Sequence, residues 1–150
     1  MKKLLLPIFA LVLLVLPILA HAGNAVDTVA VQGYDLVSYH QGDGTPAKGS
    51  GNHVVYHDGV GYLFSNDFNK KTFEENPAKY LPAYGGYCAF GVTKGKKFEG
   101  DPLAYKLVDG RVYLNLSKDV QKIWLEDVSG NIQSANKQWP GIKNIHASEL

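Results

Sequence analysis

Two Asp-Gly pairs, Asp58-Gly59 and Asp109-Gly110, place the strongest limits on how this chain can fold. Each pair stands between two segments rich in β-forming residues, which are 54–57 and 62–64 for the first pair and 104–108 and 112–116 for the second. An Asp-Gly pair between such segments is a strong signal of a two-residue hairpin turn, because both turn residues need a positive φ. The sequence therefore predicts two β-hairpins.

A helix is expected directly after the first hairpin. Ser65 or Asn66 can cap this helix, which we expect to run to Asn76 because Pro77 cannot continue it. We expect the buried side of the helix to carry Phe68, Thr72 and Phe73.

A second helix is expected after the second hairpin. Ser117 can cap it, and we expect it to continue to about Val128. Residues at helical spacing form an apolar stripe on this segment, namely Val120, Ile123 and Trp124. A short last helix is predicted from Asn131 to Trp139, before Pro140-Gly141.

The two hairpin-and-helix units match each other at an offset of 51 residues. Matched positions include Asp58 with Asp109, Gly59 with Gly110, Tyr62 with Tyr113, Leu63 with Leu114, Asn66 with Ser117 and Phe73 with Trp124. The alternative is coincidence, since Asp-Gly turns are common. One such unit cannot bury its apolar face alone, but two packed together can. We therefore predict one small α+β domain in which both hairpins contribute to one sheet. Its expected core comprises Phe64, Phe73, Tyr80, Leu114, Trp124 and Trp139.

The N-terminal segment has the three parts of a secretory signal peptide. Lys2 and Lys3 precede an almost purely apolar run over 4–19, and Ala20-His21-Ala22 offers small residues for cleavage. The alternative is an uncleaved membrane anchor, for which about 20 apolar residues are typical. We predict a signal peptide over 1–22 and a mature domain over 23–150 that is periplasmic or secreted, without stable membrane insertion.

Composition excludes several classes of function. Hydrophobic residues make up 45% of the chain, which is too many for a disordered protein. The 15 Lys and Arg side chains nearly balance the 14 Asp and Glu side chains, so the charge gives no reason to expect a nucleic-acid partner. Cys88 is the single cysteine, and an intrachain disulfide is therefore impossible.

The stretch from Val31 to Gly141 resembles the exported branch of the YHS-domain family. The residues that carry the resemblance are 33–39, 62–65, Phe73, Pro77, 79–82, 84–89, Asp109-Gly110, 113–115 and Trp139-Pro140. The resemblance implies the α+β fold and a link to heavy-metal handling. Ser38 and Ser65 stand at or near the positions where the wider family has cysteines.

Any site chemistry must then centre on Cys88. Gly85-Gly86 predicts a turn, and a short helix over 87–93 would hold Cys88 in its first turn, where the helix dipole favours a thiolate. A thiolate can bind a soft metal ion such as Cu(I) or Zn²⁺, or act as a nucleophile. The alternative is a small buried hydrophobe among Tyr84, Tyr87 and Phe90. Asn115, expected to be half-buried in its strand, needs a hydrogen-bond partner, and the loop around Cys88 is one candidate.

His40 and His57 are the candidate metal ligands beside Cys88. His53 lies four residues before His57, and on a strand that spacing sets the two about 13 Å apart, too far to share one ion. The spacings of a closed zinc site are absent from the sequence.

Three hypotheses of function follow. The first is an exported binding module for a soft metal ion or small ligand centred on Cys88, with His40 and His57 as further ligands. The second is a structural or interaction domain with an inert, buried cysteine. The third is a thiol-dependent redox enzyme with His40 or His57 as the base, and we rank it last because no motif secures a Cys–His contact. No residue is assigned a catalytic role, and a protein partner is not specified.

Overall fold

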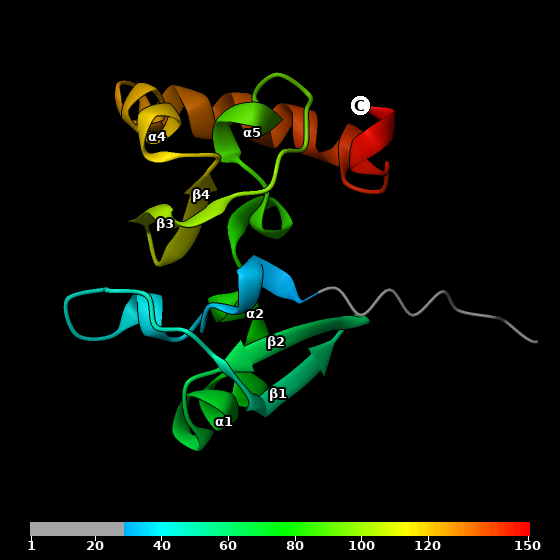
Figure 1. Cartoon of the computed structure of the whole chain (residues 1–150). Helices are drawn as coiled ribbons and strands as arrows, with labels where there is room; N and C mark the ends of the chain where they lie inside the picture. The colour runs from blue at the N-terminus through cyan, green and yellow to red at the C-terminus, as the bar shows by residue number, and fades with distance from the viewer. Residues whose placement is uncertain (1–28) are drawn as a thin grey trace, which may run out of the picture.

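The structure is a computed structural model that describes residues 29–150, and it shows a small α+β fold (Figure 1). The predicted signal peptide and the first residues of the mature domain lie outside the described residues. Within 29–150, no helix is both long and apolar enough to cross a membrane.

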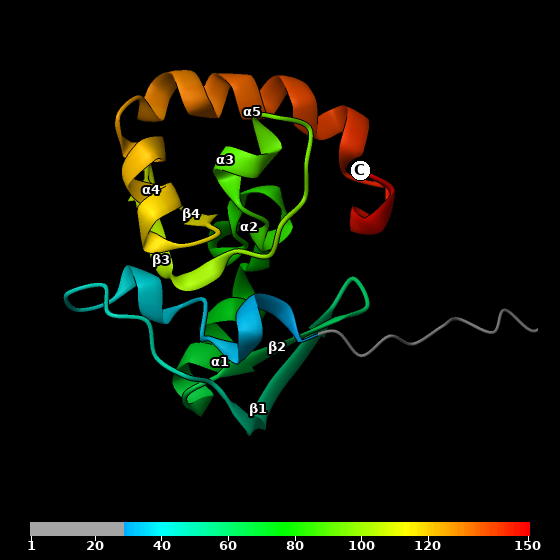
Figure 2. The same ribbon diagram turned by 45° about the horizontal axis from the view of Figure 1, so that its top comes forward.

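The fold consists of two similar units, followed by a helix. The first unit contains η1 (Ala30–Gly33), η2 (Ser38–His40), β1 (Ser50–His57), β2 (Val60–Phe64) and α1 (Asp67–Glu75). The short helix α2 (Pro77–Tyr80) leads to the second unit. That unit contains η3 (Ala83–Gly86), α3 (Ala89–Val92), β3 (Asp101–Val108), β4 (Arg111–Asn115) and α4 (Lys118–Leu125). Helix α5 (Val128–Ile142) lies across α3 and α4, as Figure 2 shows, and η4 (Ala147–Glu149) follows it.

Both predicted hairpins are confirmed. Asp58 and Gly59 have φ values of 50° and 76°, and Asp109 and Gly110 have values of 50° and 74°. Two successive positive φ values define the turn whose twist suits a two-residue hairpin.

The hairpins form two separate two-stranded antiparallel sheets, so the prediction of one shared sheet was wrong. Side chains of α4 occupy the outer edge of β3, since Lys118 donates to the Leu103 carbonyl and Gln121 donates to the Tyr105 carbonyl. A strand edge whose carbonyls are already bonded cannot accept a further strand there.

The predicted repeat is present in three dimensions. Every pair in the register of β1 with β2 recurs 51 residues later in β3 with β4, and both hairpins have an irregularity after their first pair. The glycine before each hairpin also recurs, because a Cβ at Gly49 or Gly100 would lie 2.5 Å from Leu63 or Leu114. The helix caps match as well. Asn66 accepts the Asn69 N–H at the start of α1, and Ser117 accepts the Val120 N–H at the start of α4. This agreement in backbone detail favours a repeated unit over coincidence.

Two clusters of buried side chains form the core. The first comprises Leu36, Val37, Tyr39, Phe64, Phe73, Tyr80, Val112 and Leu114, and the second comprises Ala83, Tyr84, Ala89, Val92, Tyr113, Trp124, Ala135 and Ile142. In β4, Val112 and Leu114 belong to the first cluster and Tyr113, which lies between them, belongs to the second. This strand is therefore buried on both faces. Five of the six predicted core residues are buried, while Trp139 is half-buried against the second cluster.

Several helix details differ from the prediction. Phe68 is 70% exposed, and Asn69 takes the buried position because its side chain reaches the buried Asp35. Ile123 is also exposed, at 49%, whereas Trp124 is buried. A buried polar partner therefore overrides the apolar pattern on α1.

The last two helices meet at a different place from the one predicted. Helix α4 ends at Leu125 because Asp127 caps a new helix, accepting the Gly130 N–H at 2.8 Å. Helix α5 is longer than predicted and passes Pro140, and the Lys143 N–H bonds the Trp139 carbonyl at 2.9 Å beyond it. A proline removes one donor from a helix, and here the ladder resumes after it.

Candidate functional site

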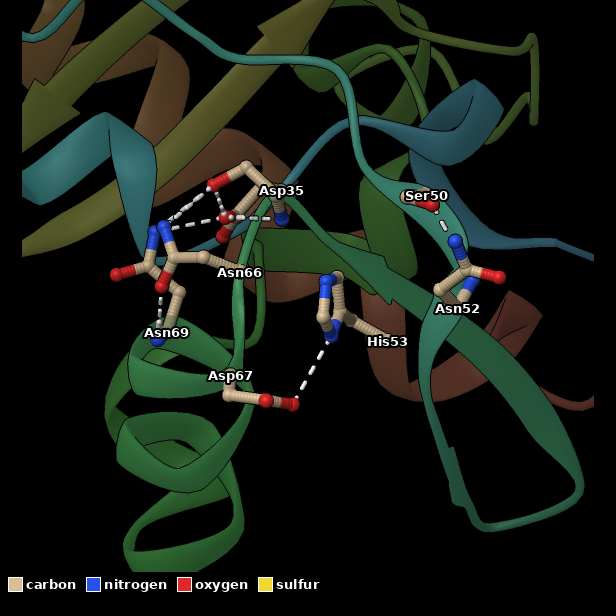
Figure 3. Close-up of polar contacts among 8 residues, drawn as sticks. Asp35, Ser50, Asn52, His53, Asn66, Asp67 and Asn69 are labelled. Carbon is tan, nitrogen blue, oxygen red and sulfur yellow. Dashed lines mark hydrogen bonds and ion pairs between the residues drawn. The ribbon is translucent and has the colours of Figure 1, made fainter.

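A buried carboxylate organises the first unit (Figure 3). Asp35 is 0% exposed and accepts five hydrogen bonds from uncharged donors. Its Oδ1 accepts the backbone N–H groups of Val37 and Ser38 at 2.9 and 3.3 Å. Its Oδ2 accepts the N–H and hydroxyl of Ser65 and the amide of Asn69 at 2.7–2.9 Å. The carboxylate thereby joins the η2 turn to the end of β2 and the start of α1.

Cys88 occupies the corresponding place in the second unit. Asp35 follows the Gly33-Tyr34 pair, and Cys88 follows Gly86-Tyr87, at an offset of 53 residues. Each of the two residues donates its own N–H to a backbone carbonyl just before the hairpin, Asp35 at 2.9 Å and Cys88 at 2.8 Å. The repeat therefore includes the turn that precedes each hairpin.

The thiol takes over part of the carboxylate's role. Cys88 caps α3, and its Sγ accepts the Gly91 N–H at 3.4 Å, as Asp35 Oδ1 accepts the Ser38 N–H. Asn115 supplies the other acceptor, since its Oδ1 receives the Phe90 N–H at 3.4 Å and lies 3.9 Å from Cys88 Sγ. The expectation that Asn115 finds its partner in the loop around Cys88 is confirmed. Cys88 precedes the short helix rather than lying in its first turn.

Burial limits what Cys88 can do. Cys88 is 1% exposed, and its sulfur has Asn115 and Gly91 as hydrogen-bond partners. Within 29–150, no hydrogen bond or ion pair joins Cys88 to a histidine. The Cys–His contact that a thiol enzyme needs is therefore not formed in this arrangement.

His40 lines an open cleft of about 410 Å³, formed by the loop 39–44 and by residues 105–107 of β3. Its ring lies edge-on to Tyr80, with 5.1 Å between the ring centroids. Its Nε2 is buried and has no hydrogen-bond partner among the residues that the structure describes. Burial, with the nearby Lys79 ammonium as a smaller cause, holds the pKa of His40 below its ordinary value of 6.5, so the ring is neutral at neutral pH.

His57 lies elsewhere, at the end of β1. Its Nε2 is 3.5 Å from the exposed Asp58 carboxylate, and its ring is edge-on to Phe73 at 6.1 Å. The neighbouring His53 is 3.0 Å from Asp67 at the start of α1, as the dashed line in Figure 3 shows.

The three predicted metal ligands have separate surroundings. Cys88 bonds to Asn115, His40 packs on Tyr80, and His57 packs on Phe73. No group of three or more His, Cys, Asp or Glu side chains in the described part of the chain could hold a metal ion. Within 29–150, these three residues are therefore not gathered in a group of three or more ligands, which a metal site centred on Cys88 with both histidines would require.

A second cleft lies where the two units meet, and sequence reasoning missed it. Its volume is about 340 Å³, and it is more enclosed than the His40 cleft. The first unit contributes residues 29–32, Val60 and Tyr62, and the second contributes residues 85–87, Glu99 and Gly100. We call this the inter-repeat cleft.

Two matching left-handed turns border the inter-repeat cleft. Val31 and Gln32 have φ values of 48° and 50°, and Tyr84 and Gly85 have values of 54° and 64°. A β-branched residue such as Val31 in this region costs roughly 1–2 kcal/mol, so the surrounding fold must hold it there. The Gln32 amide donates to the Gly100 carbonyl at 3.3 Å across the two units. The repeated Gly-Tyr pairs that follow the turns were the signal that could have revealed this site.

In comparisons with known proteins, no family model, no curated protein and no solved structure matches the chain.

Proposed function

We propose that this chain is a small exported binding module whose ligand occupies the inter-repeat cleft. The observation that carries the proposal is the position of the cleft, which takes its lining from both repeats and from both left-handed turns. Binding sites favour concave, mostly apolar places between structural units, at volumes of about 300–1,000 Å³. Strained backbone also gathers at functional sites more than elsewhere.

The lining indicates the chemical class of ligand. Most of the surface is apolar, and among the lining residues Glu99 carries the one charged side chain. Tyr62 and Tyr87 add aromatic rings, and burial raises the pKa of the Tyr62 phenol, which keeps it protonated as a donor. These groups suit a small organic molecule with an apolar body and a hydrogen-bonding group.

The export part of the proposal rests on the signal-peptide pattern in 1–22. A mature protein beginning at Gly23 would support it.

The burial of Cys88 bears on the other two hypotheses. A soft metal ion is less well supported, because Cys88 is buried and the two histidines pack on different aromatic rings. The inert-cysteine alternative gains support from the same burial, since Cys88 already serves as a hydrogen-bond acceptor in its turn.

Nuclear magnetic resonance with small aromatic probes tests the proposal. We expect indole, phenol or benzylamine to shift the backbone amide signals of Gln32, Gly85, Gly86 and Gly100. Val60→Trp should fill the cleft and abolish these shifts. Arg111→Trp is the matched control, because Arg111 holds the position in β4 that Val60 holds in β2 and does not line the cleft. Shifts that survive Val60→Trp, or no shift with any of the three probes, would contradict the proposal.

A further inference from the structure

One buried donor of the residue that contacts Cys88 is unpaired within residues 29–150. Asn115 is 0% exposed, and its Nδ2 makes no hydrogen bond to any of the residues that the structure describes. Leaving such a group unpaired costs about 1–3 kcal/mol, so an unpaired amide in a core calls for a physical reason.

The orientation of the Asn115 amide is set by its neighbours. The Phe90 N–H donates to Oδ1 at 3.4 Å, so exchanging the amide oxygen and nitrogen would place two donors face to face. The same Oδ1 lies 3.9 Å from Cys88 Sγ. Nδ2 is bonded to the same carbon as Oδ1, so the unpaired donor belongs to the amide group that contacts the thiol.

The first unit shows what the second one lacks. Asp35 has two acceptor atoms, and Oδ2 takes donors from Ser65 and Asn69, while Oδ1 takes the two backbone donors. Cys88 has one acceptor atom, which already receives the Gly91 N–H. One oxygen added to the sulfur would supply a second acceptor, which the Asn115 amide could use.

We propose that Cys88 is an oxidation site, which a hydroperoxide converts to a sulfenic acid that the Asn115 amide stabilises. The sulfur attacks one peroxide oxygen, and an S–O bond forms as the O–O bond breaks. The thiol proton leaves with the departing oxygen, as water from hydrogen peroxide or as an alcohol from an alkyl hydroperoxide. The sulfur loses two electrons and the peroxide gains them. The proposal is independent of the inter-repeat cleft, since neither Cys88 nor Asn115 lines that cleft.

Burial shapes the expected chemistry. Hydrogen peroxide is small enough to enter through local openings, whereas a bulky aromatic disulfide reagent is not. With Cys88 as the single cysteine, the sulfenic acid has no thiol in the same chain with which to condense. We therefore expect the sulfenic acid to persist in the folded protein.

Mass spectrometry of the purified protein after hydrogen peroxide treatment provides the test. We expect the peptide containing Cys88 to gain one oxygen when the folded protein is treated with peroxide. When the oxidised protein is then unfolded in the presence of dimedone, the same peptide should carry a dimedone adduct. The chain's single methionine is Met1, which cannot contribute to this peptide. Absence of the added oxygen before unfolding would overturn the proposal, as would fast reaction of the folded protein with the bulky disulfide reagent.

Variants isolate the role of the amide. Asn115→Leu removes the donor at similar volume, and we expect its sulfenic acid to be lost about tenfold faster through further oxidation, the effect of one hydrogen bond to a polar oxygen. Asn131→Leu is the control, because that side chain bonds the Trp124 carbonyl instead. Should Asn115→Leu not fold, the side-chain amide signal of Asn115 in the unmodified sequence decides: it should shift on peroxide addition, and an unchanged signal would overturn the proposal.

Discussion

Asp35 and Cys88 hold the same position in the two halves of the molecule, at the turn that follows a Gly-Tyr pair. Each donates its N–H to a carbonyl before its hairpin and accepts the N–H three residues ahead, from Ser38 or Gly91. The repeat thus places a carboxylate in one unit and a thiol with an asparagine in the other. In this arrangement the buried Cys88 sulfur accepts the Gly91 N–H and contacts Asn115 Oδ1.

Serine should replace Cys88 with little loss of stability. A serine hydroxyl also accepts the Gly91 N–H, whereas Cys88→Ala leaves that donor unpaired, and we expect alanine to cost about 1–2 kcal/mol more than serine. Urea titration of the two variants measures the difference. Equal stabilities would show that the sulfur does not act as an acceptor.

Removing the charge of Asp35 should destabilise the fold strongly. Asp35→Asn keeps the shape but turns an amide NH2 toward the Ser65 backbone N–H and the Asn69 amide N–H, which can only donate. We expect a loss of about 3 kcal/mol in the free energy of unfolding. Asp43→Asn is the matched control, since Asp43 also accepts a backbone N–H, from Thr45, but is exposed. A loss below about 1 kcal/mol for Asp35→Asn would mean that the network is not needed.

Truncating either repeat's central aromatic residue should be costly. Phe73 and Trp124 are both fully buried, and we expect Phe73→Ala or Trp124→Ala to cost about 3–5 kcal/mol. That is a large share of the roughly 5–15 kcal/mol that holds a domain together. Phe68→Ala on the exposed side of α1 should change the urea midpoint little, and a comparable loss there would contradict the burial assigned to α1.

Stability should fall in mild acid because of His40. Burial lowers the pKa of His40 in the folded state, so the unfolded chain binds more protons as the pH falls. The contribution is fully present above the ordinary pKa of 6.5 and is lost as the pH drops through the lower folded-state value. The difference in unfolding free energy between the native chain and His40→Phe, measured from neutral pH downward, should show this loss. A difference that does not vary with pH would contradict it.

Metal content distinguishes the proposed small-molecule ligand in the inter-repeat cleft from a metal ion bound at Cys88. With Cys88, His40 and His57 in separate surroundings, we expect protein purified from its native compartment to carry no stoichiometric copper or zinc. Elemental analysis of the protein and of Cys88→Ser measures this. A bound metal that disappears in Cys88→Ser would support the metal-binding hypothesis instead.

Local sequence signals determined the elements of this fold. The Asp-Gly pairs, the caps Asn66 and Ser117, and the offset of 51 residues predicted the hairpins, the helices and the repeat, because turn geometry and capping depend on a few adjacent residues. The same local reasoning assigned Phe68 to the core, and it failed because the amide of Asn69 is needed by Asp35, which lies 34 positions earlier.

Tertiary structure alone decided the surroundings of the candidate residues. The sequence named the loop around Cys88 as one candidate partner of Asn115, but it could not show that the Cys88 sulfur is fully buried there, since that contact joins the residue before α3 to a strand 27 residues away. It could not reveal that His40 packs on Tyr80 while His57 packs on Phe73, or that two left-handed turns border one cleft. Short-range patterns carry turn and helix preferences, whereas burial and clefts arise only when distant segments pack together. In this protein that packing gives the predicted ligands different neighbours and joins the two repeats.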